Sequence, residues 1–220
     1  MASGNTSALM SLRDPDIRLM LRVRDADDAA AFAQLVELYQ QRVVAVMHHL
    51  LGKLDNAEDL AQEVFLRIYR IRKKYRPKAK FSTWLFTIAN NLAMNARRDR
   101  ARRPAVQLDP QESGPMPQAP SMSGREPAPS SGLVQQELAI VIRKALDELN
   151  DRQRMAVVLN KFEDMGYAEI AEVMELSTKA VKSLLSRARA RLREVLQPYI
   201  YMDGEPAPMN VDANDSEGMP

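Results

Sequence analysis

The chain has 220 residues, of which 45% are hydrophobic, and a formal net charge of +2, values that are ordinary for a globular protein with a buried core. It contains no cysteine, which excludes disulfide bonds and thiolate metal sites. No apolar run reaches the ~20 residues that span a bilayer, and the N-terminus lacks the pattern of a signal peptide. We therefore expect a cytoplasmic protein without membrane insertion.

Charged residues are segregated along the chain. Residues 67–103 contain 13 Lys or Arg and one acid, and residues 176–193 contain six bases and no acid. Residues 14–63 instead hold ten acids and five bases, and residues 203–220 hold five acids and no base. Two basic blocks indicate two contacts with a polyanion, although charge alone fits two solvated helix faces equally well.

Composition divides the chain into five parts. Residues 104–132 contain seven Pro, three Gly and five Ser, and such a segment cannot bury enough apolar surface to offset its ordering entropy. We expect it to be a flexible linker between one module at 25–103 and a second at 133–200. Residues 1–24 are expected to be an N-terminal extension, and residues 201–220 an acidic, disordered tail.

The first module begins with two predicted helices. Apolar residues at 3.6-residue spacing predict a helix over residues 32–50, which Gly52 ends. Asp55 and Glu58 resemble a capping box at the start of the next helix, which extends to about residue 74. The face of this helix that is acidic and amidic, with apolar neighbours, suits a protein partner. It consists of Glu58, Asp59, Gln62 and Glu63.

A third helix is expected after a basic loop. Pro77 breaks the chain inside that loop, and Ser82 is placed to cap the helix. Phe81, Trp84 and Phe86 lie beside the basic residues, in a pattern in which cations hold a phosphate backbone while aromatic rings stack on unpaired bases. Core packing is the favoured interpretation for Phe86, whereas packing and stacking fit Trp84 equally well.

The second module is expected to contain four helices, at about 133–149, 151–162, 167–174 and 178–196, with Pro198 closing the last of them. The last two are joined by a three-residue turn, and the small side chain of Ala171 lets them cross closely. This is the helix–turn–helix pattern, whose second helix enters the major groove of DNA. An ordinary helical hairpin with a solvated basic face is disfavoured, because the length of the turn, the small residue at the crossing and the charge on one side all fit a helix–turn–helix.

Outward positions of the last helix carry Lys, Arg, Ser and Thr, which can contact base edges or phosphates. These positions are Thr178, Lys179, Lys182, Ser183, Ser186 and Arg187, and Arg189 extends the basic surface toward the DNA backbone.

Several motifs occur together in one order: the helix NAEDLAQEVFLRIYR, the segment FSTWL, an Asn- and Arg-rich helix, a linker, and YAEIAEVM followed by VKSLLSRARARL. This order resembles the extracytoplasmic-function (ECF) branch of the bacterial sigma-70 family, over about 25–103 and 133–198. The resemblance implies an all-α protein with two helical domains, sigma-2 and sigma-4, joined by a flexible linker. It also implies a promoter-specific transcription initiation factor that is not an enzyme and has no cofactor, catalytic residue or metal.

The resemblance further implies partners and sites. The partners are the clamp and flap of core RNA polymerase, promoter DNA and an anti-sigma factor, with no obligate homo-oligomer. The residues that would bind the clamp are Asp59, Leu60, Gln62, Glu63, Phe65 and Arg67. Those that would capture and contact the minus-ten element are Arg76, Lys78, Lys80, Phe81, Trp84, Asn91, Asn95, Arg97 and Arg98. The minus-thirty-five element would be read by Lys182, Ser183, Ser186 and Arg187.

The sequence departs from the family pattern at two positions of the helix–turn–helix. Glu175 stands where the turn commonly has Gly, and a positive φ there strains a residue that carries a Cβ atom. Ala180 stands where Thr is common, which removes one phosphate contact. The acidic tail either competes for the basic surfaces or, in the favoured interpretation, only increases solubility.

Two other function classes fit the sequence less well. An enzyme or metal site has little support, because His48 and His49 are the only histidines and adjacent helical residues point about 100° apart. A self-sufficient helix–turn–helix regulator that binds operators as a dimer is the second alternative. It has no reason to carry the FSTWL segment and the Asn- and Arg-rich helix that follows.

Overall fold

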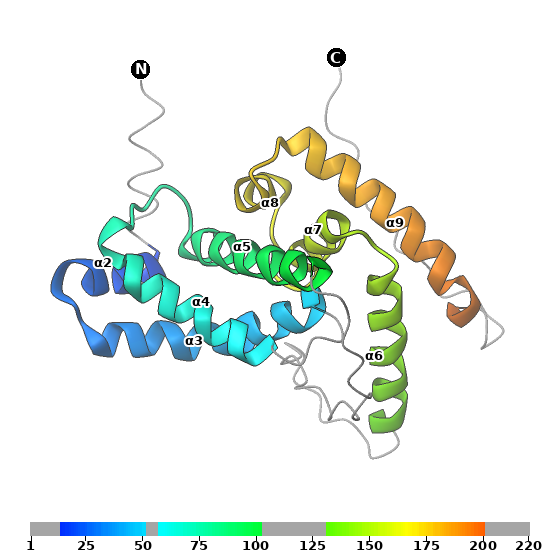
Figure 1. The fold of residues 1–220 in the computed structure, drawn as a ribbon, viewed down its shortest axis with the longest axis horizontal. Helices are drawn as coiled ribbons and strands as arrows, with labels where there is room; N and C mark the ends of the chain where they lie inside the picture. The colour runs from blue at the N-terminus through cyan, green and yellow to red at the C-terminus, as the bar shows by residue number, and fades with distance from the viewer. Residues whose placement is uncertain (1–13, 52–56, 103–130, 201–220) are drawn as a thin grey trace.

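The computed structural model describes residues 14–51, 57–102 and 131–200, and every regular element within them is a helix (Figure 1). The all-α prediction is thereby confirmed. No helix in this part of the chain is long and apolar enough to cross a membrane. In chain order the elements are α2 (Pro15–Ala26), α3 (Ala29–Leu51), α4 (Ala57–Ile71), the 3-10 helix η1 (Arg72–Lys74), α5 (Phe81–Arg102), α6 (Ser131–Asp147), α7 (Asp151–Lys161), α8 (Tyr167–Met174) and α9 (Thr178–Ile200).

Some predictions concern residues outside the described ranges. They include the helix end at Gly52, the capping role of Asp55, most of the linker and the acidic tail. These stay predictions. The described bounds of α3 and α4 agree with the two helices that apolar periodicity placed there.

Helix α2 was not predicted. Its N-terminus is capped by Asp14, whose side chain accepts a hydrogen bond from the backbone N–H of Asp16 at 2.9 Å, and a proline follows at the first helical position. Ile17, Met20 and Val23 recur at three-residue spacing and are buried against α3. Residues 15–24, expected to be an extension, therefore belong to the core of the first module.

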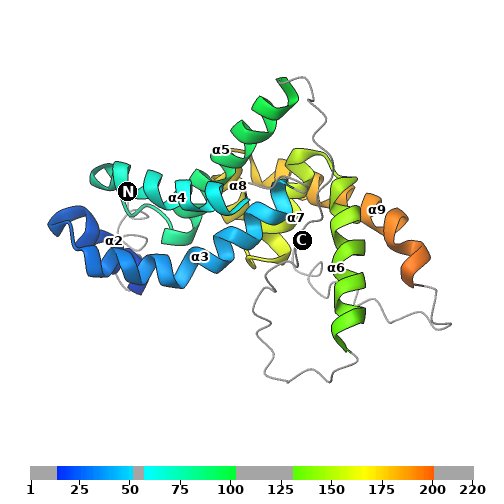
Figure 2. The same ribbon diagram turned by 60° about the horizontal axis from the view of Figure 1, so that its bottom comes forward.

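Helices α3, α4 and α5 pack on one another and complete that core. Phe86 on α5 is fully buried, so its interpretation as a core residue is confirmed. Burying a side chain of this size contributes about 1.5–3 kcal/mol to stability. The packing holds α5 across the module, so that its basic C-terminal half leads away from the core (Figure 2).

Two predicted helix boundaries were wrong. Helix α5 begins at Phe81, and the N–H of Trp84 bonds to the carbonyl of Lys80, so Ser82 lies inside the first turn and is not the cap. Pro198 lies inside α9, which continues to Ile200. A proline there removes a single backbone hydrogen bond within the last turn, which the helix tolerates better than a break in its middle.

The second module consists of α6 to α9. Asn150 and Gln153 form a capping box at the start of α7, which satisfies two backbone N–H groups that a helix N-terminus leaves free. Helix α8 has the bounds predicted for it, 167–174. Ile170 of α8 and Val181 of α9 are fully buried and join the two helices of the helix–turn–helix.

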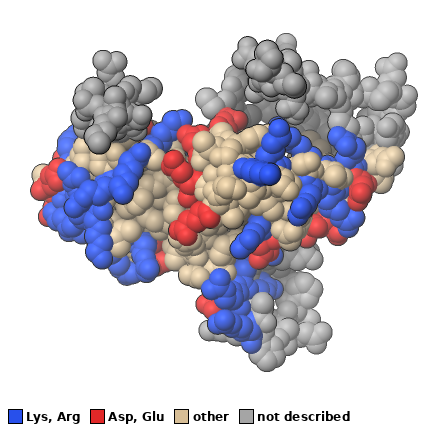
Figure 3. All heavy atoms as spheres, turned by 90° about the horizontal axis from the view of Figure 1, so that it is seen from above, with Lys and Arg blue, Asp and Glu red and all other residues tan. Residues whose placement is uncertain are grey.

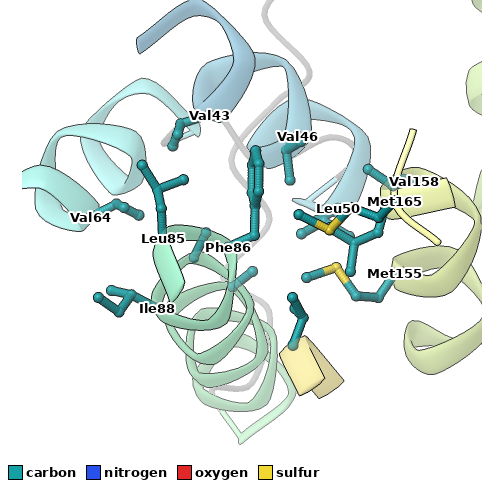
Figure 4. Packing of buried hydrophobic residues seen from close by; sticks show 14 of the residues in the cluster. Val43, Val46, Leu50, Val64, Leu85, Phe86, Ile88, Met155, Val158 and Met165 are labelled. Carbon is teal, nitrogen blue, oxygen red and sulfur yellow. The ribbon is translucent and has the colours of Figure 1, made fainter. Parts of the chain in front are cut away.

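The two modules share one hydrophobic core. Helix α7 packs against α3, and α8 packs against α5. Figure 4 shows Leu50 and Phe86 of the first module facing Met155, Val158 and Met165 of the second. All five side chains are buried. The structure thus joins the two modules into a single body.

Candidate nucleic-acid and polymerase interfaces

Basic side chains gather in more than one area of the surface. Figure 3 shows Lys and Arg over the end of the molecule where α2 and the loop before α5 lie, over the side where α9 lies, and in a further group at the bottom of the view. A band of acidic side chains separates the first two areas.

The loop before α5 presents its cations around an aromatic cluster. Lys78 is exposed, and Arg76 donates hydrogen bonds to the carbonyl oxygens of Lys73 and Tyr75, at 3.4 and 3.0 Å. Lys80 is exposed but forms an ion pair of 2.8 Å with Glu169 of α8. Of the three predicted cations, Arg76 and Lys78 face solvent without a partner from the second module.

The aromatic cluster has a buried base and a half-exposed top. Phe81 is only 1% exposed, so it supports the cluster and does not itself face a base. Trp84 is half-buried, with its ring centroid 4.7 Å from that of Tyr75 and 6.1 Å from that of Phe81. Tyr75, which sequence reasoning missed, is buried beneath it. Trp84 is the ring of this cluster that can meet an incoming base.

The outer face of α5 carries the predicted Asn and Arg side chains. Asn91, Asn95 and Arg98 are exposed. Arg97 instead donates a hydrogen bond of 2.7 Å to the carbonyl of Leu50 in its own module and forms an ion pair of 2.6 Å with Asp151 of the second module. Three of the four residues are therefore available to DNA in this arrangement.

The helix–turn–helix has the predicted turn. Its backbone passes through Glu175 with φ 53° and ψ 46°, and the N–H of Leu176 bonds to the carbonyl of Ala171 at 2.9 Å. The Ser177 hydroxyl then accepts a hydrogen bond from the N–H of Ala180 at 3.2 Å and caps α9. The positive φ expected at the position of Glu175 is confirmed.

Helix α9 has one face buried in the core and an opposite face exposed to solvent. Val181, Leu185 and Ala188 are buried at spacings of four and three residues, so the opposite side points to solvent. Arg189 is half-buried and donates to the hydroxyl of Tyr167 at 3.1 Å, and Ser183 is half-buried. The exposed residues of the predicted reading face are Thr178, Lys179, Lys182, Ser186 and Arg187.

Replacing Glu175 with Gly is expected to raise the free energy of unfolding by about 1 kcal/mol, because glycine adopts the left-handed conformation without the strain of a Cβ atom. The melting temperature should rise by about 3 °C for a chain of this size. Calorimetry measures both. The matched control is Glu172→Gly, at an exposed position inside α8, which should lower stability by about 1 kcal/mol. A loss in both variants would contradict stored strain at the turn.

Helix α4 presents the predicted protein-binding residues at the edge of a groove. Asp59, Gln62 and Arg67 are exposed, while Leu60 and Glu63 are half-buried and Phe65 is buried. The groove, about 550 Å³, lies between α3 and α4 and is lined by Phe32, Val36, Gln40, Gln41, Val44, Glu58, Ala61, Gln62, Phe65 and Leu66.

Leu66 is a groove residue that the sequence prediction missed. Its side chain is 52% exposed, and it adds apolar surface to the edge of the apolar hollow. Its position one turn after Gln62 on an amphipathic helix was the available signal. An apolar hollow with an acidic and amidic edge is the form expected of a protein-binding surface.

The two histidines lie in packed surroundings. The ring of His49 stacks on that of Phe162 of the second module, with centroids 4.0 Å apart. Burial, with His48 and Arg143 nearby, lowers the pKa of His49 to about 4. No group of three or more His, Asp or Glu side chains that could hold a metal ion occurs within 14–51, 57–102 and 131–200.

Comparisons with known proteins assign both modules. The sigma-70 region 2 model matches residues 35–103, and the sigma-70 region 4 model matches residues 139–192. The ECF RNA polymerase sigma factor SigW of Bacillus subtilis is 31% identical over 172 residues, which are 77% of this chain and 91% of that protein.

Solved structures share the fold of this chain. CnrH in complex with the cytosolic domain of CnrY matches with a TM-score of 0.62 at 24% identity, over 84% of this chain and 99% of that chain. The sigma factor RpoE in complex with the anti-sigma factor NepR, from Bartonella quintana, matches with a TM-score of 0.56 at 25% identity, over 76% and 96%. The chain belongs to the ECF branch of the sigma-70 family, and it is a non-enzymatic sigma factor for promoter-specific transcription initiation.

Proposed function

We propose that three surfaces of this sigma factor divide the work of initiation. The groove between α3 and α4 docks on the clamp of core RNA polymerase, the loop before α5 and the outer face of α5 engage the minus-ten element, and the outer face of α9 reads the minus-thirty-five element. The observation that carries the proposal is the exposed polar and cationic face of α9, opposite a fully buried core face. Such a face on the second helix of a helix–turn–helix fits the major groove.

Contact with the minus-ten element combines phosphate binding and stacking. Arg76 and Lys78 face solvent beside Trp84, so they can hold the backbone of a strand whose base lies on the indole ring. Opening of the duplex needs no covalent chemistry. The lost base pairing and stacking are offset by contacts with the protein, in which one stacked base contributes about 1–3 kcal/mol. Asn91, Asn95 and Arg98 lie further along α5, where they can contact the adjoining duplex edge.

Docking on polymerase uses the hollow between α3 and α4. Asp59 and Gln62 at its edge supply polar contacts, and Phe65 and Leu66 supply apolar area. Burial of one exposed leucine in a partner interface contributes about 1.5–3 kcal/mol. The flap of the polymerase is proposed to hold the second module near the minus-thirty-five element.

An anti-sigma factor is the proposed regulator. The RpoE structure that this chain resembles contains such a partner. The hollow between α3 and α4 is exposed in this chain, so a partner that covered it would prevent docking on polymerase. Regulation of this kind needs no change in the sigma factor other than the loss of a free surface.

The proposed function is tested by run-off transcription with purified core polymerase on genomic fragments. Adding the sigma factor is expected to create start sites that core polymerase alone does not use. A protein that bound DNA tightly by itself, as a dimer, and created no start sites would instead be a self-sufficient regulator. Sedimentation of the free protein distinguishes the two, since the sigma factor is expected to be a monomer.

Replacing Arg187 with Ala is expected to weaken promoter use in a way that depends on the minus-thirty-five sequence. A guanidinium that contacts a guanine edge contributes about 1–3 kcal/mol of discrimination, so the preferred base at one position should lose its advantage. Binding to a set of single-base variants measures this. The control Arg193→Ala, at an exposed position six residues further along α9, should weaken all variants equally. A uniform loss for Arg187→Ala would assign it to phosphate.

A further inference from the structure

Helix α2 takes no part in the three surfaces proposed above. It ends before residue 35, where the match to the sigma-70 region 2 model begins, so that match gives it no role. It packs against α3, η1 and α5, and it lies at the end of the first module that carries the loop before α5 (Figure 1). The same three elements carry the rings around Trp84, so contacts with α2 bear on how that ring is held.

Tyr39 of α3 connects α2 to the aromatic cluster. Its ring packs edge-on against that of Phe81, with centroids 5.3 Å apart and planes at 71°, a favoured arrangement of two aromatic rings. Its hydroxyl donates a hydrogen bond to the carboxylate of Asp16, in the first turn of α2. Only 4% of Tyr39 is exposed, and a hydroxyl buried to this degree needs a partner. Asp16 therefore fixes the polar end of a ring whose edge supports Phe81.

The hydrogen bond between Tyr39 and Asp16 is of a strong and persistent kind. A hydrogen bond to a carboxylate is about twice as strong as one between neutral groups. Burial, and then the bond to Asp16, raise the pKa of Tyr39 above its ordinary value, so its hydroxyl remains a donor at neutral pH.

The C-terminal part of α2 holds the other side of the cluster. Arg24 donates a hydrogen bond of 3.3 Å from Nη1 to the carbonyl of Tyr75. In return, Nζ of Lys73 donates to the carbonyl of Arg24 at 2.8 Å and pairs with Asp27, directly after α2, at 2.9 Å. These bonds tie η1 and the backbone of Tyr75 to α2.

Trp84 lies against both of the rings that α2 supports, with its centroid 4.7 Å from that of Tyr75 and 6.1 Å from that of Phe81. We propose that α2 positions the ring that captures a base: Asp16 and Tyr39 are positioning residues that hold the indole of Trp84 in the orientation that receives an unpaired base. This inference rests on the proposed stacking role of Trp84. A ring that is fixed before the base arrives loses no rotamer freedom when the base binds, which favours opening.

The position of the ring can be measured directly, because the chain has a single tryptophan and its fluorescence reports Trp84 alone. In the free full-length protein, the anisotropy decay of the indole is expected to show little motion on the nanosecond timescale. Tyr39→Phe keeps the ring and removes the hydroxyl. It should raise the ratio of mobile to fixed indole rings about two- to tenfold, which corresponds to the freeing of one side chain.

Tyr75→Phe is the matched control for the decay. The hydroxyl of Tyr75 is also buried, but it has no hydrogen-bond partner in the part of the chain that the structure describes. Its removal should leave the decay unchanged. A change of equal size in Tyr75→Phe would mean that any altered tyrosine near Trp84 loosens the ring, and would overturn the role of the Asp16 bond.

The acceptor is tested on α2 itself. Asp16→Asn keeps an oxygen that can accept the hydrogen bond and should retain most of the rigidity, whereas Asp16→Ala should behave like Tyr39→Phe. The double variant with Asp16→Ala and Tyr39→Phe should show no further change, because both substitutions remove the same bond. Additive effects would show that the two residues act separately.

The effect on base capture is measured with holoenzyme, by permanganate reactivity. Tyr39→Phe is expected to reduce promoter opening about two- to tenfold, with closed binding unchanged. The control for a general loss of stability is Val46→Ala, which removes buried apolar contacts of α3 about two turns from Tyr39. At a temperature where every variant is folded, Val46→Ala should open promoters normally.

The two readouts separate the possible failures. An unchanged decay in Tyr39→Phe would overturn the positioning of the ring. A mobile ring with normal opening, alongside a defective Trp84→Ala, would overturn the importance of positioning for base capture. Normal opening in Trp84→Ala itself would remove the proposed stacking function, and the decay, which needs no polymerase or DNA, distinguishes that result from a failure of the support by α2.

Discussion

Replacing Trp84 with Ala is expected to reduce promoter opening about 5- to 150-fold while leaving the initial closed complex nearly unchanged, because one stacked base contributes about 1–3 kcal/mol. The indole is half-buried above Tyr75 and Phe81, so its exposed side is the side that an extruded base can reach. Duplex DNA offers no free base, and the closed complex therefore gains nothing from the ring.

Two measurements separate the steps for Trp84. Permanganate reactivity of unpaired thymines reports opening, and filter binding at low temperature reports the closed complex. Trp84→Phe keeps an aromatic face and should retain most of the opening, which controls for lost packing against Tyr75. Melting temperatures of both variants show whether the fold is intact. Equal losses of opening and closed binding in a folded Trp84→Ala protein would assign the residue a structural role.

Replacing Leu66 with Gln is expected to weaken binding to core polymerase about 10- to 150-fold, which corresponds to the 1.5–3 kcal/mol of a leucine buried in an interface. About half of the Leu66 side chain is already exposed, and glutamine has a helix propensity similar to that of leucine. The free protein should therefore fold normally. Fluorescence anisotropy of labelled sigma factor titrated with core polymerase gives the affinity.

The chain offers a matched control for Leu66. Leu38 on α3 is 55% exposed and does not line the hollow between α3 and α4. Leu38→Gln should therefore change neither affinity nor stability. If both variants bind core polymerase like the unaltered protein, the hollow is not the docking surface and the polar residues of α4 act without it.

Local patterns predicted the helices well where they were bounded by clear signals. The bounds of α8 followed from Gly166 and the turn that ends at Ser177. Helix α2 was missed because its apolar positions lie among charged residues, although Asp14 and Pro15 form a recognisable start. The burial of Phe81 was not predicted, since an aromatic residue beside cations fits a core as well as a base.

The contact between the modules had no signal in the sequence. Val46 and Leu50 belong to an apolar stripe that predicts a core, but a stripe does not say which helices cover it. Glu163 follows a predicted helix end and reads as an exposed loop residue, whereas the structure buries it against Arg42. Contacts between residues more than a hundred positions apart depend on how the folded modules fit together. Local sequence patterns therefore do not predict them.

The two-sided construction of α9 has a consequence for how promoter preference can change over evolutionary time. Val181, Leu185 and Ala188 hold the helix in place, while the side chains proposed to read DNA are exposed and lie outside that packing. Substitutions at exposed positions of this kind usually alter stability by no more than about 0.5 kcal/mol. A duplicated copy of this protein could therefore acquire a new set of target genes through a few changes at Lys182, Ser186 or Arg187, without first having to become more stable.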